Sequence, residues 1–245
     1  MQGKIMKGVA GVYQVHVPQK GVYECKPKGI FRKDKQKPLV GDDVKIEVLK
    51  EEERTGLIVN LLPRKSELIR PAVANIDQAL VIFAIVKPQP NFNLLDRFLI
   101  MMEQQGIPCM ICFNKLDLDE TQDGEQYKAM YEACGYPCIQ VSAKNGEGIA
   151  ELKRMLQGKT PTVAGPSGVG KSSIINELQS GIRMETGDIS TKIERGKHTT
   201  RHSEFITMDE NTYILDTPGF SSLAVFDMEK EELEQFYPEF DDYRD

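Results

Sequence analysis

The sequence lacks a membrane-spanning segment, because it contains no apolar run near the roughly 18 residues that a transmembrane helix needs. Its first residues, MQGKIMKG, also lack the apolar centre of a signal peptide. With 40% hydrophobic and 28% charged residues, a chain of 245 residues has room for one large domain or two smaller ones. We therefore expect a cytoplasmic globular protein with no membrane partner.

Cysteine is scarce and odd in number, which argues against a disulfide framework. The five residues are Cys25, Cys109, Cys112, Cys134 and Cys138. Cys109 and Cys112 have the C-x-x-C spacing of metal and redox sites, but they lie in the apolar run IPCMICFN. Residues three apart on a strand point to opposite faces, so we predict buried cysteines rather than a metal or redox site.

Charge is unevenly distributed along the chain. Residues 1–70 contain 15 Lys and Arg against 9 Asp and Glu, whereas the remaining residues contain 16 against 28. The segment 28–37 alone contributes five basic side chains, with Phe31 among them. Basic and aromatic residues together are typical of RNA-binding surfaces, so the basic end is predicted to meet a polyanion. A lysine-rich surface that is merely solvated is the alternative interpretation.

The first 70 residues have the pattern of a small all-β barrel of the oligonucleotide-binding (OB) type. Short apolar-alternating segments separated by turn residues predict about five strands and no helix. Four of these segments are 9–17, 21–27, 44–50 and 55–62. A Gly-Asp-Asp turn at 41–43 begins one of them and resembles the middle of many such barrels. Residues 63–75, punctuated by Pro63 and Pro71, are predicted to be a connector.

Beyond Asn75 the pattern changes to strands alternating with helices, which favours an α/β domain with a mostly parallel sheet. The predicted strands are 78–86, 108–114, 137–143, 161–165, 203–208 and 212–217. The predicted helices are 93–105, 125–134, 148–156 and 171–179. Ligands of such folds bind at the carboxyl ends of the strands.

One of these strand–turn–helix junctions carries the complete phosphate-loop pattern G-x-x-x-x-G-K-[ST]. Its residues are Gly165, Pro166, Ser167, Gly168, Val169, Gly170, Lys171, Ser172 and Ser173. A glycine-rich turn followed by a helix start aims backbone N–H groups at phosphate oxygens. Lys171 is predicted to reach the β- and γ-phosphates and Ser172 to hold Mg²⁺. The pattern does not choose between ATP and GTP.

The second predicted strand ends in an N-K-x-D tetrapeptide, which is typical of guanine recognition. Its residues are Asn114, Lys115, Leu116 and Asp117. A carboxylate at Asp117 can accept two hydrogen bonds from guanine N1–H and the 2-amino group, a pattern that adenine does not offer. Asn114 is predicted to tie neighbouring loops together, and the stem of Lys115 to lie along the base.

Three further motifs follow the pattern of a GTPase. The third strand ends in Ser142, Ala143 and Lys144, which resembles the guanine-supporting S-A-K sequence. The last strand ends in D-T-P-G, where Asp216 is predicted to bind the Mg²⁺ shell and Gly219 to sense the γ-phosphate. Between the phosphate loop and D-T-P-G lies K-H-T-T, which is predicted to be a switch loop in which Thr199 or Thr200 binds Mg²⁺.

The order of the motifs is unusual, because N-K-L-D and S-A-K precede the phosphate loop, which comes first in ordinary GTPases. The chain therefore resembles a circularly permuted GTPase. With the barrel, T-G-D-I-S (186–190), G-K-H-T-T (196–200) and D-T-P-G-F (216–220), it closely resembles the ribosome small-subunit-dependent GTPase A family, known as RsgA, YjeQ or YloQ. That resemblance covers essentially the whole chain. It implies a GTPase that binds the 30S subunit late in its assembly, contacts 16S rRNA and hydrolyses GTP faster when the subunit is bound. From the motifs we expect the reaction to depend on Mg²⁺, and we expect the protein to be a monomer.

The family resemblance also implies a domain layout with a C-terminal zinc domain. We expect a barrel in residues 1–70, a permuted GTPase domain in 71–225 and the acidic start of a truncated zinc domain in 226–245. No cysteine or histidine follows His202, so the Zn²⁺ ligands of the family are absent from this sequence.

The residue that would orient the attacking water is open. Phe220 stands where ordinary GTPases usually have a glutamine, so we predict that His198 takes this role, with His202 as the competing choice. Two alternatives remain for the function: a nucleotide-gated rRNA-binding module with negligible turnover, and an enzyme that uses ATP.

Overall fold

The computed structural model describes residues 1–29, 31, 37–68, 72–185, 204–209, 211–216, 230–237 and 239–240. The chain divides into two compact units. The first contains Met1–Asp77, Gly158–Thr160 and Thr200–Thr217, and the second contains Gln78–Gln157, Pro161–Thr199 and Pro218–Asp245. In the described part, no helix combines the length and the apolar character that crossing a membrane would require.

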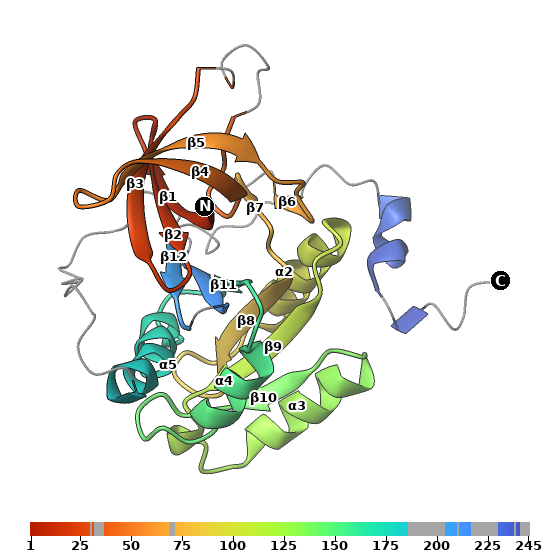
Figure 1. Ribbon diagram of the computed structural model, residues 1–245. Helices are drawn as coiled ribbons and strands as arrows, with labels where there is room; N and C mark the ends of the chain where they lie inside the picture. Colours follow the sequence, from red (N-terminus) through yellow and green to blue (C-terminus); the bar gives the residue numbers. More distant parts are fainter. Residues whose placement is uncertain are drawn as a thin grey trace. The chain divides into compact units, whose positions relative to one another are not determined.

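The first unit is built on a closed five-stranded barrel, as the sequence predicts (Figure 1). Its strands are β1 (Gln2–Val9), β2 (Val12–Val17), β3 (Gly21–Pro27), β4 (Asp43–Lys50) and β5 (Thr55–Leu61). They close in the order β1-β2-β3-β5-β4. Alternate side chains point inward and form the barrel core of Ile5, Tyr13, Val15, Val17, Tyr23, Cys25, Val44, Ile46 and Ile58.

Strand β1 lies outside the predicted segments, because its apolar alternation is weak. A glycine occupies one inward position, Gly3, where an added Cβ would lie 2.5 Å from the carbonyl oxygen of His16. The pairing of β1 with β2 then shifts register between Ile5 and Lys7, so that both Ile5 and Met6 are buried. A strand with a small inward residue and a bulge does not show the period of two by which strands are recognised.

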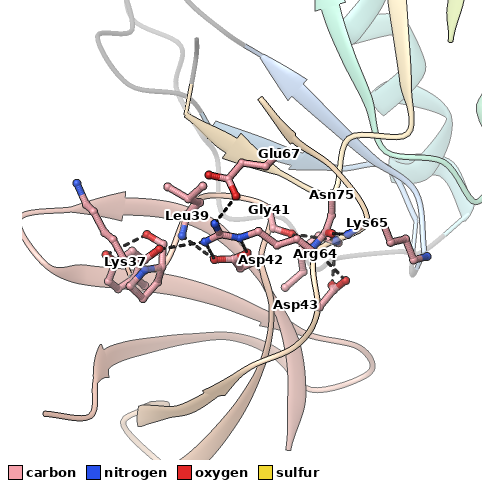
Figure 2. Close-up of polar contacts among 12 residues, drawn as sticks. Lys37, Leu39, Gly41, Asp42, Asp43, Arg64, Lys65, Glu67 and Asn75 are labelled. Carbon is pink, nitrogen blue, oxygen red and sulfur yellow. Dashed lines mark hydrogen bonds and ion pairs between the residues drawn. The ribbon is translucent and has the colours of Figure 1, made fainter. Parts of the chain in front are cut away.

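The connector between the units is more ordered than the sequence predicts. It forms two short strands, β6 (Glu67–Leu68) and β7 (Val73–Ala74), which pair antiparallel. Its Arg64 donates from Nε to Asp42 Oδ1 (2.7 Å) and from Nη2 to Asp42 Oδ2 (2.9 Å), while the side chain of Asp42 is 0% exposed (Figure 2). The Gly-Asp-Asp turn of the barrel is therefore bound to the connector by a buried ion pair.

Asn75 makes the second attachment of the connector to the same turn. Its Nδ2 donates to the carbonyl oxygen of Gly41 (2.9 Å), and its Oδ1 accepts from the N–H of Lys65 (2.8 Å) (Figure 2). Gly41 has a φ of +95°, and a Cβ there would lie 2.0 Å from the carbonyl oxygen of Ala74. Only glycine permits this approach of the turn to the connector.

A hairpin from late in the chain belongs to the barrel unit. It consists of β12 (Glu204–Thr207) and β13 (Tyr213–Asp216), which pair antiparallel. The hydroxyl of Tyr213 shares a hydrogen bond of 3.1 Å with His16 Nδ1, and Lys4 Nζ lies 5.6 Å from the centre of the Tyr213 ring. These contacts attach β13 to the outside of the barrel.

The second unit is an α/β domain that confirms the predicted alternation. Four parallel strands lie in the order β10-β9-β8-β11. Their bounds are β8 (Gln78–Ala84), β9 (Cys109–Asn114), β10 (Cys138–Gln140) and β11 (Pro161–Ala164). The helical elements are α2 (Phe92–Gln104), η1 (Leu116–Leu118), α3 (Asp123–Ala133), α4 (Ile149–Leu156), α5 (Lys171–Glu185) and η2 (Lys230–Phe236).

The core of this unit explains the near-continuous apolar runs of its strands. Every residue of β8 is buried, as expected for an inner parallel strand that is covered on both faces. Cys109 and Cys112 of β9 are also buried, and burial raises the pKa of both thiols. The prediction that they are core residues is therefore confirmed.

Candidate nucleotide-binding site

The phosphate loop connects β11 to α5, at the carboxyl end of the parallel strands. Gly165 begins the loop with a φ of +135°, and a Cβ there would lie 2.1 Å from the carbonyl oxygen of Ile82. Gly170 ends it with a φ of +95°, and a Cβ there would lie 2.3 Å from Asn114 Nδ2. Both positions require glycine, because the loop packs directly on β8 at one end and on the end of β9 at the other.

Lys171 begins α5 and folds back over the loop. Its Nζ donates to the carbonyl oxygens of Gly165 (2.8 Å) and Pro166 (2.6 Å). The ammonium group is thus held within the turn, where the N–H groups at the start of α5 also point. Ser172 and Ser173 follow it in the first turn of the helix and are exposed.

Asn114 is the last residue of β9 and joins two loops through one buried amide. Its Nδ2 donates to the carbonyl oxygen of Val169 in the phosphate loop (2.8 Å). Its Oδ1 accepts from the N–H of Ala143 (3.1 Å). The sequence predicts that Asn114 ties the loops together, and these two hydrogen bonds confirm that position. The support of guanine by Ser142, Ala143 and Lys144 stays a prediction.

Lys115 extends from the end of β9 toward the phosphate loop. It has a φ of +69°, and its Nζ donates to the carbonyl oxygen of Gly168 (2.8 Å) and to that of Lys87. Lys87 belongs to none of the sequence motifs. Its place after β8 is a usable signal, because the carboxyl ends of adjacent parallel strands lie at one edge of the sheet.

Asp117, in η1, is held by the S-A-K segment. Ser142, which is buried, donates from Oγ to Asp117 Oδ1 (2.7 Å), and Lys144 Nζ lies 3.5 Å from Asp117 Oδ2. The Ser142 hydrogen bond lowers the pKa of Asp117, partial burial opposes this shift, and Lys144 adds to it. The side chain of Asp117 is 13% exposed and that of Lys144 is 79% exposed, so the carboxylate is shielded but reachable.

The remaining predicted residues are not brought together by the described structure. His198, Thr199, Thr200 and Gly219 lie outside the described residues. Asp216 is described as the last residue of β13, in the barrel unit. The predicted roles of these residues in Mg²⁺ binding and hydrolysis therefore stay predictions.

The described part of the candidate site places two kinds of polar group at one edge of the sheet. Backbone N–H groups and the Lys171 ammonium supply positive potential at the phosphate loop. The Asp117 carboxylate supplies paired acceptors at the S-A-K side. Asn114 fixes the distance between these two parts by binding both loops.

In comparisons with known proteins, both parts of the chain match family models. A family model described as RsgA GTPase matches residues 61–226, and a model described as RsgA N-terminal domain matches residues 2–58. The chain is 60% identical to a small ribosomal subunit biogenesis GTPase RsgA of Agathobacter rectalis, over 99% of this chain and 84% of that protein. It is 48% identical to the protein of the same name from Alkaliphilus metalliredigens, over 99% of this chain and 82% of that protein.

Solved structures give the same result at the level of the fold. The crystal structure of YjeQ from Thermotoga maritima has a TM-score of 0.80 and 33% identity, covering 98% of this chain and 82% of that one. YloQ, described as a circularly permuted GTPase, has a TM-score of 0.76 and 37% identity, covering 97% of this chain and 77% of that one. The predicted fold, a permuted GTPase domain preceded by an OB-like barrel, is confirmed by these structures. Since the family models match both parts of the sequence and a relative shares 60% of its residues, the chain belongs to the RsgA GTPase family.

Proposed function

We propose that this GTPase hydrolyses GTP in a Mg²⁺-dependent reaction during late assembly of the small (30S) ribosomal subunit, and that the bound subunit stimulates it. Membership of a GTPase family supports the reaction. The relatives from Agathobacter rectalis and Alkaliphilus metalliredigens are named as small ribosomal subunit biogenesis GTPases, which supports the process. A cytoplasmic monomer fits this proposal.

The single observation that carries the choice of nucleotide is the geometry of Asp117. Its carboxylate has one oxygen held by Ser142 and the other close to Lys144, so its orientation is fixed before a nucleotide binds. A fixed carboxylate can accept from guanine N1–H and N2–H at little entropic cost. Adenine presents no such pair of donors, so GTP and GDP are preferred over ATP.

The phosphate loop would bind the polyphosphate, and Lys171 would exchange its loop carbonyls for phosphate oxygens. The oxygen donors proposed for Mg²⁺ suit a hard cation: the exposed hydroxyl of Ser172, the carboxylate of Asp216, and Thr199 or Thr200. When bound, Mg²⁺ would neutralise charge on the β- and γ-phosphates. His198 is proposed to orient water and the N–H of Gly219 to sense the γ-phosphate.

We also propose that RNA binding and GTP hydrolysis belong to different segments of the chain. We assign residues 1–70 to a barrel that binds 16S rRNA, residues 71–225 to the permuted GTPase domain, and residues 226–245 to an acidic C-terminal segment. The excess of basic residues in the first segment supports the rRNA contact.

The test of the guanine site is Asp117→Asn. The amide keeps an acceptor for Ser142 but presents N–H where guanine also presents N–H, so GDP affinity should fall about 10-fold or more, the loss of roughly 1.5–3 kcal/mol expected for a charged hydrogen bond. Xanthosine diphosphate carries a carbonyl in place of the 2-amino group and should bind the variant better than GDP does. The measurement is calorimetric titration of both nucleotides, with Glu147→Gln, an exposed carboxylate nearby, as the control. Unchanged GDP affinity would remove Asp117 from the base site.

The test of the process is multiple-turnover phosphate release with and without purified small subunits. Stimulation by the subunit, lost in the presence of excess GDP, supports the proposed function. Binding of the subunit without any turnover would favour the nucleotide-gated rRNA-binding module instead.

A further inference from the structure

The second unit contains a cavity that no part of the nucleotide site uses. It lies between α2 and α3 and has a volume of about 420 Å³. Phe92, Asp96 and Ile100 line it from α2, Tyr127 and Met130 from α3, and the segment after η2 adds residues to its wall. Small-ligand sites usually measure about 300–1,000 Å³, so a cavity of this size can hold a ligand group.

The wall of this cavity is rich in aromatic rings. Phe92, Tyr127, Tyr131, Tyr136 and Tyr237 all line it. The ring of Phe92 meets that of Tyr127 edge-on, with centroids 4.9 Å apart, and lies 6.2 Å from that of Tyr131. Aromatic faces carry negative potential and attract organic cations, which bury an apolar body against the rings at the same time.

Among the described residues that line the cavity, the charged side chains are the carboxylates of Asp96 and Glu239, and none is Lys or Arg. Asp96 Oδ1 accepts from the hydroxyl of Tyr131 (2.8 Å), which fixes that carboxylate. Glu239 Oε2 is buried and accepts no hydrogen bond within the described residues, and the thiol of Cys134, a weak donor, interacts with the same carboxylate. A buried carboxylate oxygen without a donor is costly, and a cationic ligand would supply the donor.

The cavity can be reached from solvent. Met130 is 45% exposed at its edge, and Gln126 of the same helix is exposed. Methionine adapts its shape to a ligand more readily than branched side chains do.

We propose that this cavity binds an arginine or lysine side chain presented by a basic segment of a partner protein. The apolar stem would lie among the aromatic rings, and the charged head would lie between Asp96 and Glu239. A guanidinium matches these walls best, because it is planar, stacks on aromatic faces and donates in a fork to carboxylates. The acidic balance of the chain beyond residue 70, 16 Lys and Arg against 28 Asp and Glu, complements a basic partner.

The test uses the whole chain with ¹³C-labelled methionine methyl groups, and Met130→Leu assigns the reporter resonance. The probe is N-acetylarginine N-methylamide, and its neutral isostere is the citrulline analogue. Saturable movement of the Met130 resonance, with the citrulline analogue at least about fivefold weaker, is the expected result.

Matched variants separate the cavity from general surface charge. The double variant Asp96→Asn, Glu239→Gln should weaken the arginine probe at least about fivefold. Glu132→Gln removes an exposed carboxylate of α3 that pairs with Lys128 outside the cavity, and it should leave binding unchanged. An equal loss of affinity in the double variant and in Glu132→Gln would mean that the arginine probe responds only to overall surface charge, and this result would overturn the proposed site.

A third probe, spermidine, tests the source of the cation. Spermidine has the charge but no planar head, so it should bind more weakly than the arginine probe. Tighter binding of spermidine would overturn the proposed partner side chain and indicate that the ligand is a free polyamine. No saturable shift with any probe would overturn the proposal entirely.

Discussion

Replacing Arg64 by alanine should destabilise the barrel unit far more than loss of a surface charge would. Arg64 holds the carboxylate of Asp42 through two hydrogen bonds, and it also donates to Glu67 Oε2 (2.7 Å) and to the carbonyl oxygen of Lys37 (3.0 Å). Within the described residues, the N–H of Leu39 (2.7 Å) is then the one hydrogen-bond donor left to the fully buried carboxylate of Asp42. The substitution therefore leaves a buried charge without its counterion.

The size of the effect follows from burial. Breaking a buried ion pair by removing one partner typically costs about 3–5 kcal/mol. The side chain of Arg64 is 19% exposed, so water can partly replace it, and we expect a loss in the free energy of unfolding near the lower limit, about 3 kcal/mol.

The assay is urea unfolding of Arg64→Ala, Asp42→Ala and the double variant, followed by circular dichroism. The double variant should be less destabilised than the sum of the single variants, with a coupling energy of about 1–3 kcal/mol. Lys50→Ala is the control, because the Lys50 and Glu53 side chains are both exposed and such pairs contribute about 0–1 kcal/mol.

A destabilisation by Arg64→Ala below about 1 kcal/mol would refute this reasoning, as would additivity of the two variants within about 0.3 kcal/mol. Either result would mean that Asp42 is stabilised by the turn around it and not by the connector. Affinity for GDP should be retained in Arg64→Ala, since the described contacts of the nucleotide site lie in the other unit.

Three further predictions concern the site and the barrel. The hydrogen bond from Ser142 is the main cause of the lowered pKa of Asp117, so the carboxylate is protonated, and GDP affinity falls, only as pH drops through that lowered pKa. Ser142→Ala should therefore shift the loss of GDP affinity to higher pH. An unchanged pH profile of GDP affinity, measured by titration, would contradict this. Affinity for 16S rRNA should fall as salt rises, because residues 1–70 release counterions from the RNA, and salt-independent binding would favour a merely solvated surface. His198→Ala should lower subunit-stimulated turnover by about 10²-fold while GDP affinity stays intact; a kcat within about twofold of wild type would exclude His198 as the water-orienting group.

The sequence predicts the parts of the site that are local in the chain. The phosphate loop, N-K-L-D and S-A-K are each contiguous, and each follows a strand whose end must lie at the same edge of a parallel sheet. Position along the chain therefore determines their meeting in space, and the hydrogen bonds of Asn114 confirm it.

Contacts between single residues far apart in the sequence could not be predicted in this way. Arg64 and Asp42 are 22 residues apart, and each is a residue type that is common in exposed turns. Ser142 is recognisable as part of S-A-K, but its hydroxyl acts on Asp117, 25 residues away, which no local pattern expresses. Lys87 contributes a backbone carbonyl, which any residue type could supply, so only its place after β8 indicates this contact.

The unusual order of the motifs has a physical explanation in the same contacts. Asn114 reaches forward by 55 residues to Val169, whereas in ordinary GTPases the phosphate loop precedes the N-K-x-D motif. A hydrogen bond depends on the distance and direction of its two groups and not on which of them comes first in the chain. Strand β8 pairs in parallel with both β9 and β11, so the ends that carry N-K-L-D and the phosphate loop stay on either side of it in any chain order that preserves these pairings. Permutation therefore changes the connections at the far ends of the strands and leaves intact the edge that carries these motifs.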